Sequence, residues 1–267
     1  AKEALQEISE EEKRIARLIE AIESGCLGQS GDAINVSTVR TQNLQTAINV
    51  VNEKRLKTSQ GLRVLKTATS LLETRRLVMS ADWESIAALI KDLDFDDLFD
   101  GAKKEFALVK NELKDREAMK ILSALLESYP VVGTVGALDT DLCDVLAMDR
   151  HIETVKTLGK LRQETNVFFE NCLKMYELRK AVITHDWDAV GKLFAELHAH
   201  KALKTLNYGN SVLSEYHLIL SEFTNRSIIR TMSPALSNNC VKGEISNLDI
   251  SNVSVFGIDK ALAMVKD

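Results

Sequence analysis

Residues 77–86 read LVMSADWESI, and residues 181–190 read AVITHDWDAV. The two stretches contain both tryptophans of the chain, and each tryptophan directly follows an aspartate. Trp187 follows Trp83 by 104 positions (187 − 83). When the sequence is shifted by this amount, apolar residues fall on apolar residues along most of its length. The two stretches therefore predict an internal repeat, and the repeat decides the architecture.

A third copy emerges when the shift is 110 positions from the second copy, which is 214 from the first. The matched columns include Ile15, Met119 and Ile229; Leu18, Leu122 and Met232; Ile22, Leu126 and Leu236; and Ile34, Leu138 and Leu248. The difference of six residues (110 − 104) predicts an insertion between Trp187 and Ile229. We expect helical repeats at 1–117 and 118–227 and a partial third repeat at 228–267, that is, two full copies and part of another.

Helices are the expected building blocks of each copy. Only two prolines and twelve glycines occur in 267 residues, and these residue types are the main helix breakers. From residue 3 to 24, apolar residues recur at spacings of three, four and seven, which is typical of an amphipathic helix. Gly25 is expected to end this helix in a left-handed conformation. The following segment, 26–36, lacks a helical period and is predicted to be a connection.

Three further helices are expected in the first copy. Ser37 is predicted to cap a long helix over 37–81, with a kink near Gly61, and Asp82 to cap a short helix. A fourth helix over 97–128 continues into the second copy. The predicted fold class is all-α, with tandem repeats of about 104 residues in an elongated or solenoid-like array. The unit length resembles that of spectrin-type repeats, although this unit has four unequal helices where a spectrin repeat has three of similar length.

The Asp-Trp pairs allow two interpretations. Asp82 and Asp186 could serve as acids or ligands, with the indoles as stacking platforms for a sugar or a base. Alternatively, each aspartate caps a helix, and each indole packs against the end of the preceding helix. Both pairs occupy the same place in the repeat, which favours the structural interpretation. No catalytic, cofactor-binding or metal-binding role is therefore predicted for these residues.

Histidines of the second copy form the next candidate site, namely His185, His198, His200 and His217. A zinc site or a general base requires side chains that converge on one face, for example at positions i and i+4. His198 and His200 are two positions apart, which separates them by about 200° around a helix. The matched positions in the first copy are Asp94 and Asp96. The two copies share only polarity here, and we predict no metal ion.

Other motifs for metal ions or phosphate are incomplete. The acidic segment 91–101, KDLDFDDLFDG, lacks the central glycine and the distant glutamate of an EF-hand loop. It is better explained as a turn leading into a helix with an acidic first turn, which the helix dipole favours. Gly25, Gly28 and Gly31 do not precede a Gly-Lys-Ser/Thr ending, so no phosphate-binding loop is expected. The four cysteines show no CxxC pair and are predicted to be small buried thiols.

Basic residues of the expected second helix are interleaved with leucines; they are Arg55, Lys57, Arg63, Lys66, Arg75 and Arg76. Such a helix can bind calmodulin or an anionic membrane surface. Within a packed repeat, the leucines are instead expected to be buried and the basic residues to lie at the solvated borders. The net charge of −5, with no basic stripe carrying aromatics, argues against nucleic acid as a partner. No apolar run reaches the roughly 18 residues that membrane insertion needs.

These observations predict a non-catalytic protein–protein interaction or spacer module, with other proteins as partners and no cofactor. Because the chain begins with Ala inside an amphipathic pattern, we expect a fragment of a larger scaffold or cytoskeletal protein in the cytoplasm. An alternative is a helical enzyme or ligand-binding domain with a pocket between repeat units near Asp186 and the nearby histidines. A third hypothesis is coiled-coil-like self-association, which requires an apolar stripe left exposed.

Overall fold

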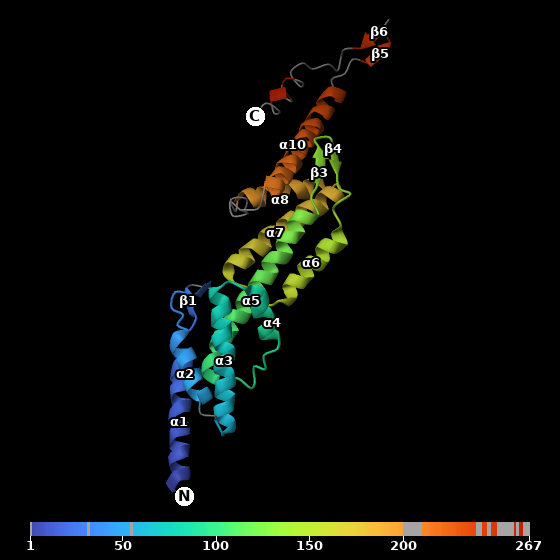
Figure 1. The fold of residues 1–267 in the computed structure, drawn as a ribbon. Coiled ribbons are helices and arrows are strands. Elements are labelled where there is room, and N and C mark those ends of the chain that lie inside the picture. The colour runs from blue at the N-terminus through green and yellow to red at the C-terminus, as the bar shows by residue number, and fades with distance from the viewer. Residues whose placement is uncertain are drawn as a thin grey trace. The chain divides into compact units, whose positions relative to one another are not determined.

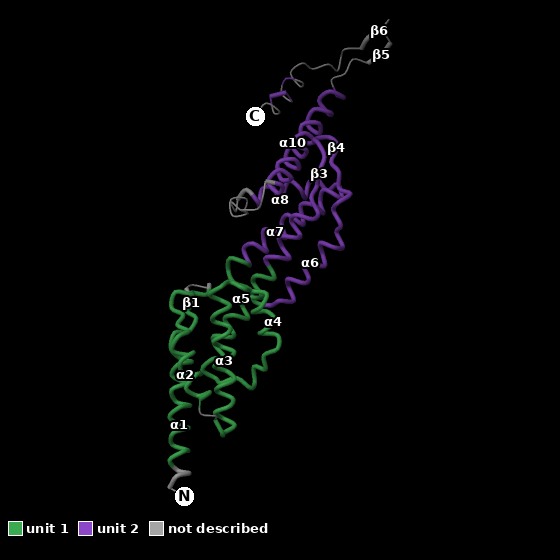
Figure 2. Tube along the Cα trace, viewed as in Figure 1, with its two compact units in different colours: residues 1–118, 160–165 green, residues 119–159, 166–267 purple. Residues whose placement is uncertain are grey.

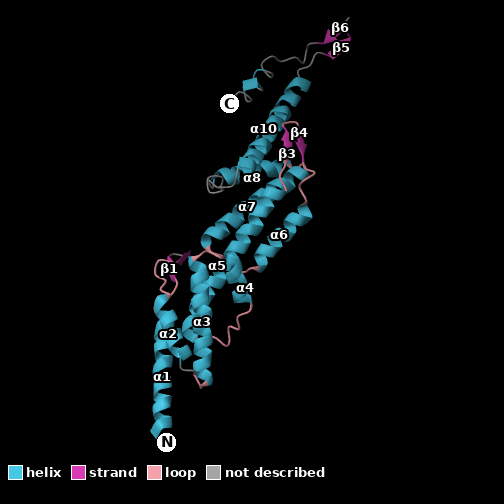
Figure 3. Cartoon of the chain, viewed as in Figure 1, coloured by secondary structure: helices cyan, strands magenta, loops and turns pink. Residues whose placement is uncertain are grey.

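The structure is a computed structural model, shown as a ribbon in Figure 1. The described residues are 2–30, 33–53, 56–199, 210–238, 242–244, 247–249, 259 and 262–263. The chain divides into two compact units, which Figure 2 distinguishes by colour: residues 1–118 with 160–165, and residues 119–159 with 166–267. Helices account for most of the described residues in both units (Figure 3).

The first unit is built from helices that the apolar periodicity largely anticipates. They are α1 (Lys2–Glu23), α2 (Gln42–Glu53), α3 (Ser59–Met79), α4 (Trp83–Lys91) and most of α5 (Asp100–Ser128). α1 packs against α2 and α3, and α3 also packs against α4. The predicted first helix is confirmed, and Gly25 follows it with a φ of 63°, the left-handed conformation that ends a helix. The short helix after Asp82 and the long helix predicted over 97–128 are also confirmed.

The described residues of the second unit include the C-terminal end of α5 and the helices that follow it. These are α6 (Val145–Thr157), α7 (Gln163–Ile183, whose first residues belong to the first unit), α8 (Trp187–Ala199) and α10 (Asn210–Asn238). α10 packs against α8. Pro234 lies inside α10, where its ring nitrogen lacks the proton for one helical hydrogen bond.

Short antiparallel hairpins follow three of the long helices. The strands are β1 (Gly28–Ser30) with β2 (Ala33–Asn35), β3 (Val132–Thr134) with β4 (Ala137–Asp139), and β5 (Lys242–Glu244) with β6 (Asn247–Asp249). The second hairpin begins 104 positions after the first, and the third begins 110 positions after the second. The segment predicted as a plain connection therefore contains two three-residue strands. Strands this short leave too few alternating positions for their period to be read from sequence.

The prediction of one helix over 37–81 is wrong. α2 ends at Glu53 and α3 begins at Ser59, with Thr58 as its N-cap, whose side chain accepts the N–H of Gly61. A second acceptor is supplied by α1, since Glu11 accepts the N–H groups of Lys57 and Thr58 at 3.0 and 2.9 Å. These bonds satisfy the N–H groups that the start of α3 leaves unpaired, so a break is stable here.

The predicted cap at Ser37 is also wrong. Its N–H and hydroxyl donate to Asn35 Oδ1 at 2.9 and 2.7 Å, which forms a turn after β2 instead of a helix start. A short polar side chain that bonds to nearby backbone in this way favours a turn over a helix.

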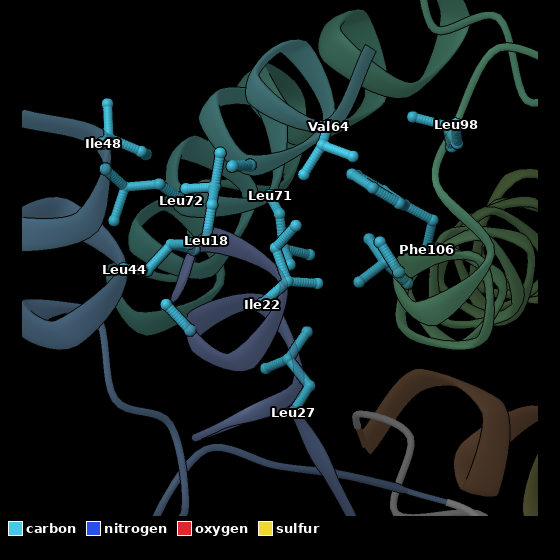
Figure 4. Packing of buried hydrophobic residues seen from close by; sticks show 14 of the residues in the cluster. Leu18, Ile22, Leu27, Leu44, Ile48, Val64, Leu71, Leu72, Leu98 and Phe106 are labelled. Atoms are coloured by element: carbon cyan, nitrogen blue, oxygen red, sulfur yellow. The ribbon is translucent and has the colours of Figure 1, made fainter. Parts of the chain in front are cut away.

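The core of the first unit is formed where α1, α2, α3 and α5 meet (Figure 4). The labelled buried residues are Leu18, Ile22, Leu27, Leu44, Ile48, Val64, Leu71, Leu72, Leu98 and Phe106. Burying each of these side chains stabilises the fold by about 1.5–3 kcal/mol. A corresponding set in the second unit includes Leu122, Leu125, Leu126, Met148, Ile152, Met175, Leu178, Phe194 and Tyr216.

The fold class is all-α, as predicted, because the described strands are confined to the three hairpins. Within the described residues, every helix is either too short or too polar to cross a lipid bilayer.

Candidate functional site

A buried ion pair lies at the centre of the first unit. Arg75 Nε of α3 is 2.9 Å from Glu105 Oε1 of α5, and both side chains are almost fully buried. The Arg75 guanidinium also donates to the carbonyl oxygens of Ile22 at 2.7 Å and Ser24 at 3.1 Å, where α1 ends. Glu105 in turn accepts the N–H of Leu27 at 3.2 Å. The pair therefore joins three helices and satisfies backbone groups that the end of α1 leaves unpaired.

A second ion pair of the same kind lies in the second unit. Arg179 Nη2 of α7 is 2.7 Å from Glu215 Oε2 of α10, and both side chains are again buried. Arg179 donates to the carbonyl oxygens of Leu125 at 2.8 Å and Leu126 at 2.7 Å, at the end of α5. Glu215 accepts the N–H of Val131 at 2.8 Å. The carbonyls of Ile22 and Leu126, and the N–H groups of Leu27 and Val131, lie 104 positions apart and are satisfied by the same chemistry in both units.

The charged groups of the two ion pairs have little capacity left to bind a ligand. Both guanidinium groups donate to carboxylate and carbonyl oxygens, so they are engaged within the protein rather than presented to an anion. The interpretation of Arg75 as a solvated border residue is therefore wrong, because Glu105 neutralises its charge in the core. A sequence signal for these pairs exists: Arg179 follows Arg75 by 104 positions, and Glu215 follows Glu105 by 110. A comparison of charged as well as apolar residues at these shifts would have found the two ion pairs.

The Asp-Trp pairs lie at helix starts, as predicted. Asp82 Oδ1 accepts the N–H of Ser85 at 3.1 Å, and Asp186 Oδ1 accepts that of Ala189 at 2.9 Å. The N–H and hydroxyl of Ser85 lower the pKa of Asp82, because they stabilise the charged carboxylate. The residues just before the caps, Ala81 and His185, share a φ of 57°, so the chain makes the same sharp turn at both joints. The capping role of both aspartates is confirmed.

Each tryptophan lies beneath an arginine. The Arg116 guanidinium is 4.0 Å from the ring centroid of Trp83, and the Arg226 guanidinium is 4.4 Å from that of Trp187. Arg116 is held by Glu112 at 2.8 Å, and Arg226 is held by Glu222, in each case one helical turn earlier. One face of each indole is therefore covered by a cation and is closed to a sugar or a base.

Acidic residues on the long helices bind the starts of other helices. In the first unit, Asp115 Oδ1 accepts the N–H of Arg162, the residue before α7, at 2.9 Å. The Arg162 guanidinium is 2.8 Å from Asp115 Oδ2 and 2.9 Å from Glu112 Oε2. Asp115 follows Glu11 by 104 positions, and Arg162 follows Thr58 by the same number. The carboxylate of Glu11, which binds the start of α3, therefore plays the same part on α1.

Of the residues named for the alternative catalytic site, the structure describes Asp186, His185 and His217 with their side chains. Asp186 is engaged as a cap, and His185 is exposed beside it. His217 lies on α10 with its ring centroid 5.6 Å from that of Tyr216. His200 and the side chain of His198 lie outside the described residues. Pockets of about 390, 380 and 140 Å³ are lined by neither Asp186 nor any histidine.

Part of the acidic segment 91–101 binds cationic side chains of the protein. Arg63 donates to the carbonyl oxygens of Asp96, Asp97 and Leu98 at 2.7–2.9 Å, and Lys66 lies 2.8 Å from Asp97 Oδ2. In the described part of the chain, no group of three His, Cys, Asp or Glu side chains is placed to hold a metal ion. The acidic first turn of the following helix is confirmed by Asp100.

The described thiols lack the environment of a nucleophile. Burial raises the pKa of Cys143 to about 11 and also raises the pKa of Cys172. Both shifts disfavour the reactive thiolate. Cys26, Cys143 and Cys172 are free thiols, but only Cys172 is fully buried, while Cys240 lies outside the described residues.

Removing one Asp cap is expected to destabilise the second unit moderately. Asp186→Ala leaves the N–H of Ala189 without its acceptor, which lowers the free energy of unfolding by about 1 kcal/mol. Asp186→Asn is the matched control, since asparagine caps a helix as well as aspartate does. Urea unfolding in a Trp83→Phe background, followed by Trp187 emission, measures both variants. Equal stability of the alanine variant and the wild type would contradict the capping role.

The chain was compared with protein-family models, with curated proteins and with solved structures, and none of the three comparisons finds a match.

Proposed function

We propose that this chain is a non-catalytic protein–protein interaction or spacer module, built from tandem helical repeats and acting as part of a scaffold in the cytoplasm. The repeats would stack their helices and present successive faces to other proteins.

The observation that carries the proposal is the recurrence of one set of polar contacts at shifts of 104 and 110 positions. The recurring elements are the buried pairs Arg75–Glu105 and Arg179–Glu215, the caps Asp82 and Asp186, the stacked pairs Trp83–Arg116 and Trp187–Arg226, and the hairpins. A single catalytic site does not require a second copy of the contacts that support it. A scaffold of similar units does, because each unit is held together by the same contacts.

The engagement of the buried charges supports a binding role over catalysis. Arg75 and Arg179 donate to carboxylate and carbonyl oxygens, and Glu105 and Glu215 accept from arginine and from backbone N–H groups. Catalytic acids and bases need a proton-accepting or proton-donating atom that faces a substrate. The apolar side chains that do face outward, among them Leu142 and Leu146 at 55% and 69% exposure, suit contacts with another protein.

Affinity capture with the whole chain, combined with a thermal-shift screen of small metabolites, tests the proposal. We expect a protein that is captured by the wild type and lost with Leu142→Asp/Leu146→Asp, whereas Asp186→Asn captures it equally. A small molecule that the chain converts, with conversion abolished by Asp186→Asn, would overturn the proposal in favour of the catalytic alternative. Asp186→Asn separates the two because it keeps the cap and removes the carboxylate.

A further inference from the structure

The C-terminal half of α10 carries an apolar stripe that is exposed. Ile229 and Leu236 are 57% and 51% exposed. Leu236 matches Leu126 of α5 at the shift of 110, and Leu126 is only 1% exposed. The neighbouring pair of matched positions differs in exposure in the same direction, since Leu122 is fully buried and its match, Met232, is half-buried. The same stripe is therefore covered on α5 and open on α10.

α7 shows what binds along the equivalent stretch of α5. The N–H of Arg162, just before α7, donates to Asp115 at 2.9 Å, and Arg179 donates to the carbonyl oxygen of Leu126 at 2.7 Å. The start of α7 therefore lies beside Asp115, and its Arg179 lies beside the end of α5. Leu161, which precedes the first contact, is buried.

α3 binds α1 by the same two contacts. The N–H of Thr58 donates to Glu11 at 2.9 Å, and Arg75 donates to the carbonyl oxygen of Ile22 at 2.7 Å. In both cases the arginine lies 17 positions after the residue whose N–H is accepted (75 − 58 and 179 − 162). Two helix pairs thus use one rule: an acceptor on the long helix holds the start of its neighbour, and an arginine reaches the carbonyls at the far end.

α10 has both elements of this rule. Asn225 matches Asp115, and its side-chain oxygen can accept an N–H. The carbonyl of Leu236 lies in the last turn of α10, where carbonyls lack helical partners. A pocket of about 380 Å³ opens beside Asn225, and it is lined by Gly136, Glu222, Asn225, Arg226, Ile229 and Arg230.

The charge of this pocket favours an acidic helix start. Glu222 is buried and held by Arg226, while Arg230 is 80% exposed and pairs with Asp188 only at the surface. Two arginines therefore border a pocket with one buried carboxylate. An acid in the first turn of an incoming helix complements them, and Glu164 occupies that position in α7.

We propose that the Asn225–Leu236 face of α10 is a docking site for an amphipathic helix of another polypeptide. The partner helix lies parallel to α10, starts at Asn225 with an acid in its first turn, covers Ile229 and Leu236, and places an arginine 17 positions later against the Leu236 carbonyl. This partner class rests on the proposed function, since it follows the rule by which the repeats bind their own helices.

A labelled peptide of residues 158–184, which carries α7 with its preceding turn, is the probe. We expect it to bind the full chain in fluorescence anisotropy, and we expect Ile229→Asp in the chain or Arg179→Leu in the peptide to weaken binding about tenfold or more. Leu213→Asp, at an exposed apolar position earlier on α10, is the control and leaves binding unchanged. Binding that Ile229→Asp does not alter would indicate exchange with the resident α7 and would overturn the proposal, as would no binding.

A photo-crosslinking residue at position 229 identifies the occupant. Crosslinking to the added peptide supports the docking site. Crosslinking to a second copy of the chain, or to residues 250–267 of the same chain in the presence of peptide, overturns it. Failure here with continued capture of a partner protein would remove only this docking site, whereas a metabolite converted through Asp186 would remove the proposed function itself.

Discussion

Replacement of Arg75 by methionine is expected to lower the free energy of unfolding by about 3–5 kcal/mol. The substitution leaves Glu105 as a buried charge without its cation, and it leaves the carbonyl groups of Ile22 and Ser24 without their donor. Methionine keeps much of the side-chain volume, so the loss reflects charge and hydrogen bonding more than a cavity. This loss is a large fraction of the stability of an ordinary domain.

Arg76→Met is the matched control for this variant. Arg76 lies on the same helix one position further, donates to Gln45 at 2.6 Å and is exposed, so its replacement is expected to change stability by about 0.5 kcal/mol or less. Urea unfolding in a Trp187→Phe background, with Trp83 as the reporter, confines the measurement to the first unit. Equal midpoints for Arg75→Met and Arg76→Met would contradict the account of the buried pair.

The double variant Arg75→Met/Glu105→Leu separates the ion pair from the fold. It is expected to recover a large part of the lost stability, because replacing both members of a buried pair by apolar side chains is often neutral. Recovery would show that the loss in the single variant comes from the uncompensated carboxylate. No recovery would assign it to the backbone carbonyls of α1 instead.

Local patterns in the sequence are sufficient to predict most helices and both Asp caps. The period of apolar residues gives α1, Gly25 gives its end, and an aspartate before an apolar run gives the start of α4. Each of these signals depends on residues within one or two turns of one another. That is why a single sequence can show them.

The contacts that could not be predicted join residues far apart in the chain. The break between α2 and α3 depends on Glu11, which lies 46 and 47 positions before the N–H groups that it accepts. The buried position of Arg75 depends on Glu105, 30 positions later, and a lone arginine on a helix is usually exposed. Sequence periodicity contains no distance information of this kind, so only the comparison of charged residues 104 and 110 positions apart could have indicated the pairs.

Leu126→Ala and Leu236→Ala are expected to differ strongly although they remove the same atoms at matched positions. Leu126 is 1% exposed, so its truncation leaves a cavity and lowers the free energy of unfolding by about 2–5 kcal/mol. Leu236 is 51% exposed, and its truncation is expected to change stability by about 0.5 kcal/mol or less. Urea unfolding in a Trp83→Phe background, reported by Trp187, measures both in the second unit.

Repeating this comparison with the peptide of residues 158–184 tests whether a helix covers the apolar stripe on α10. If a helix covers the stripe on α10, Leu236 becomes a buried contact, and Leu236→Ala then reduces the stabilisation that the peptide confers on the chain. Leu126→Ala lowers stability by the same amount with and without the peptide, because that side chain is already buried within the chain. A large effect of Leu236→Ala without peptide would mean that the chain itself covers the stripe, and it would place the occupant of α10 within this polypeptide.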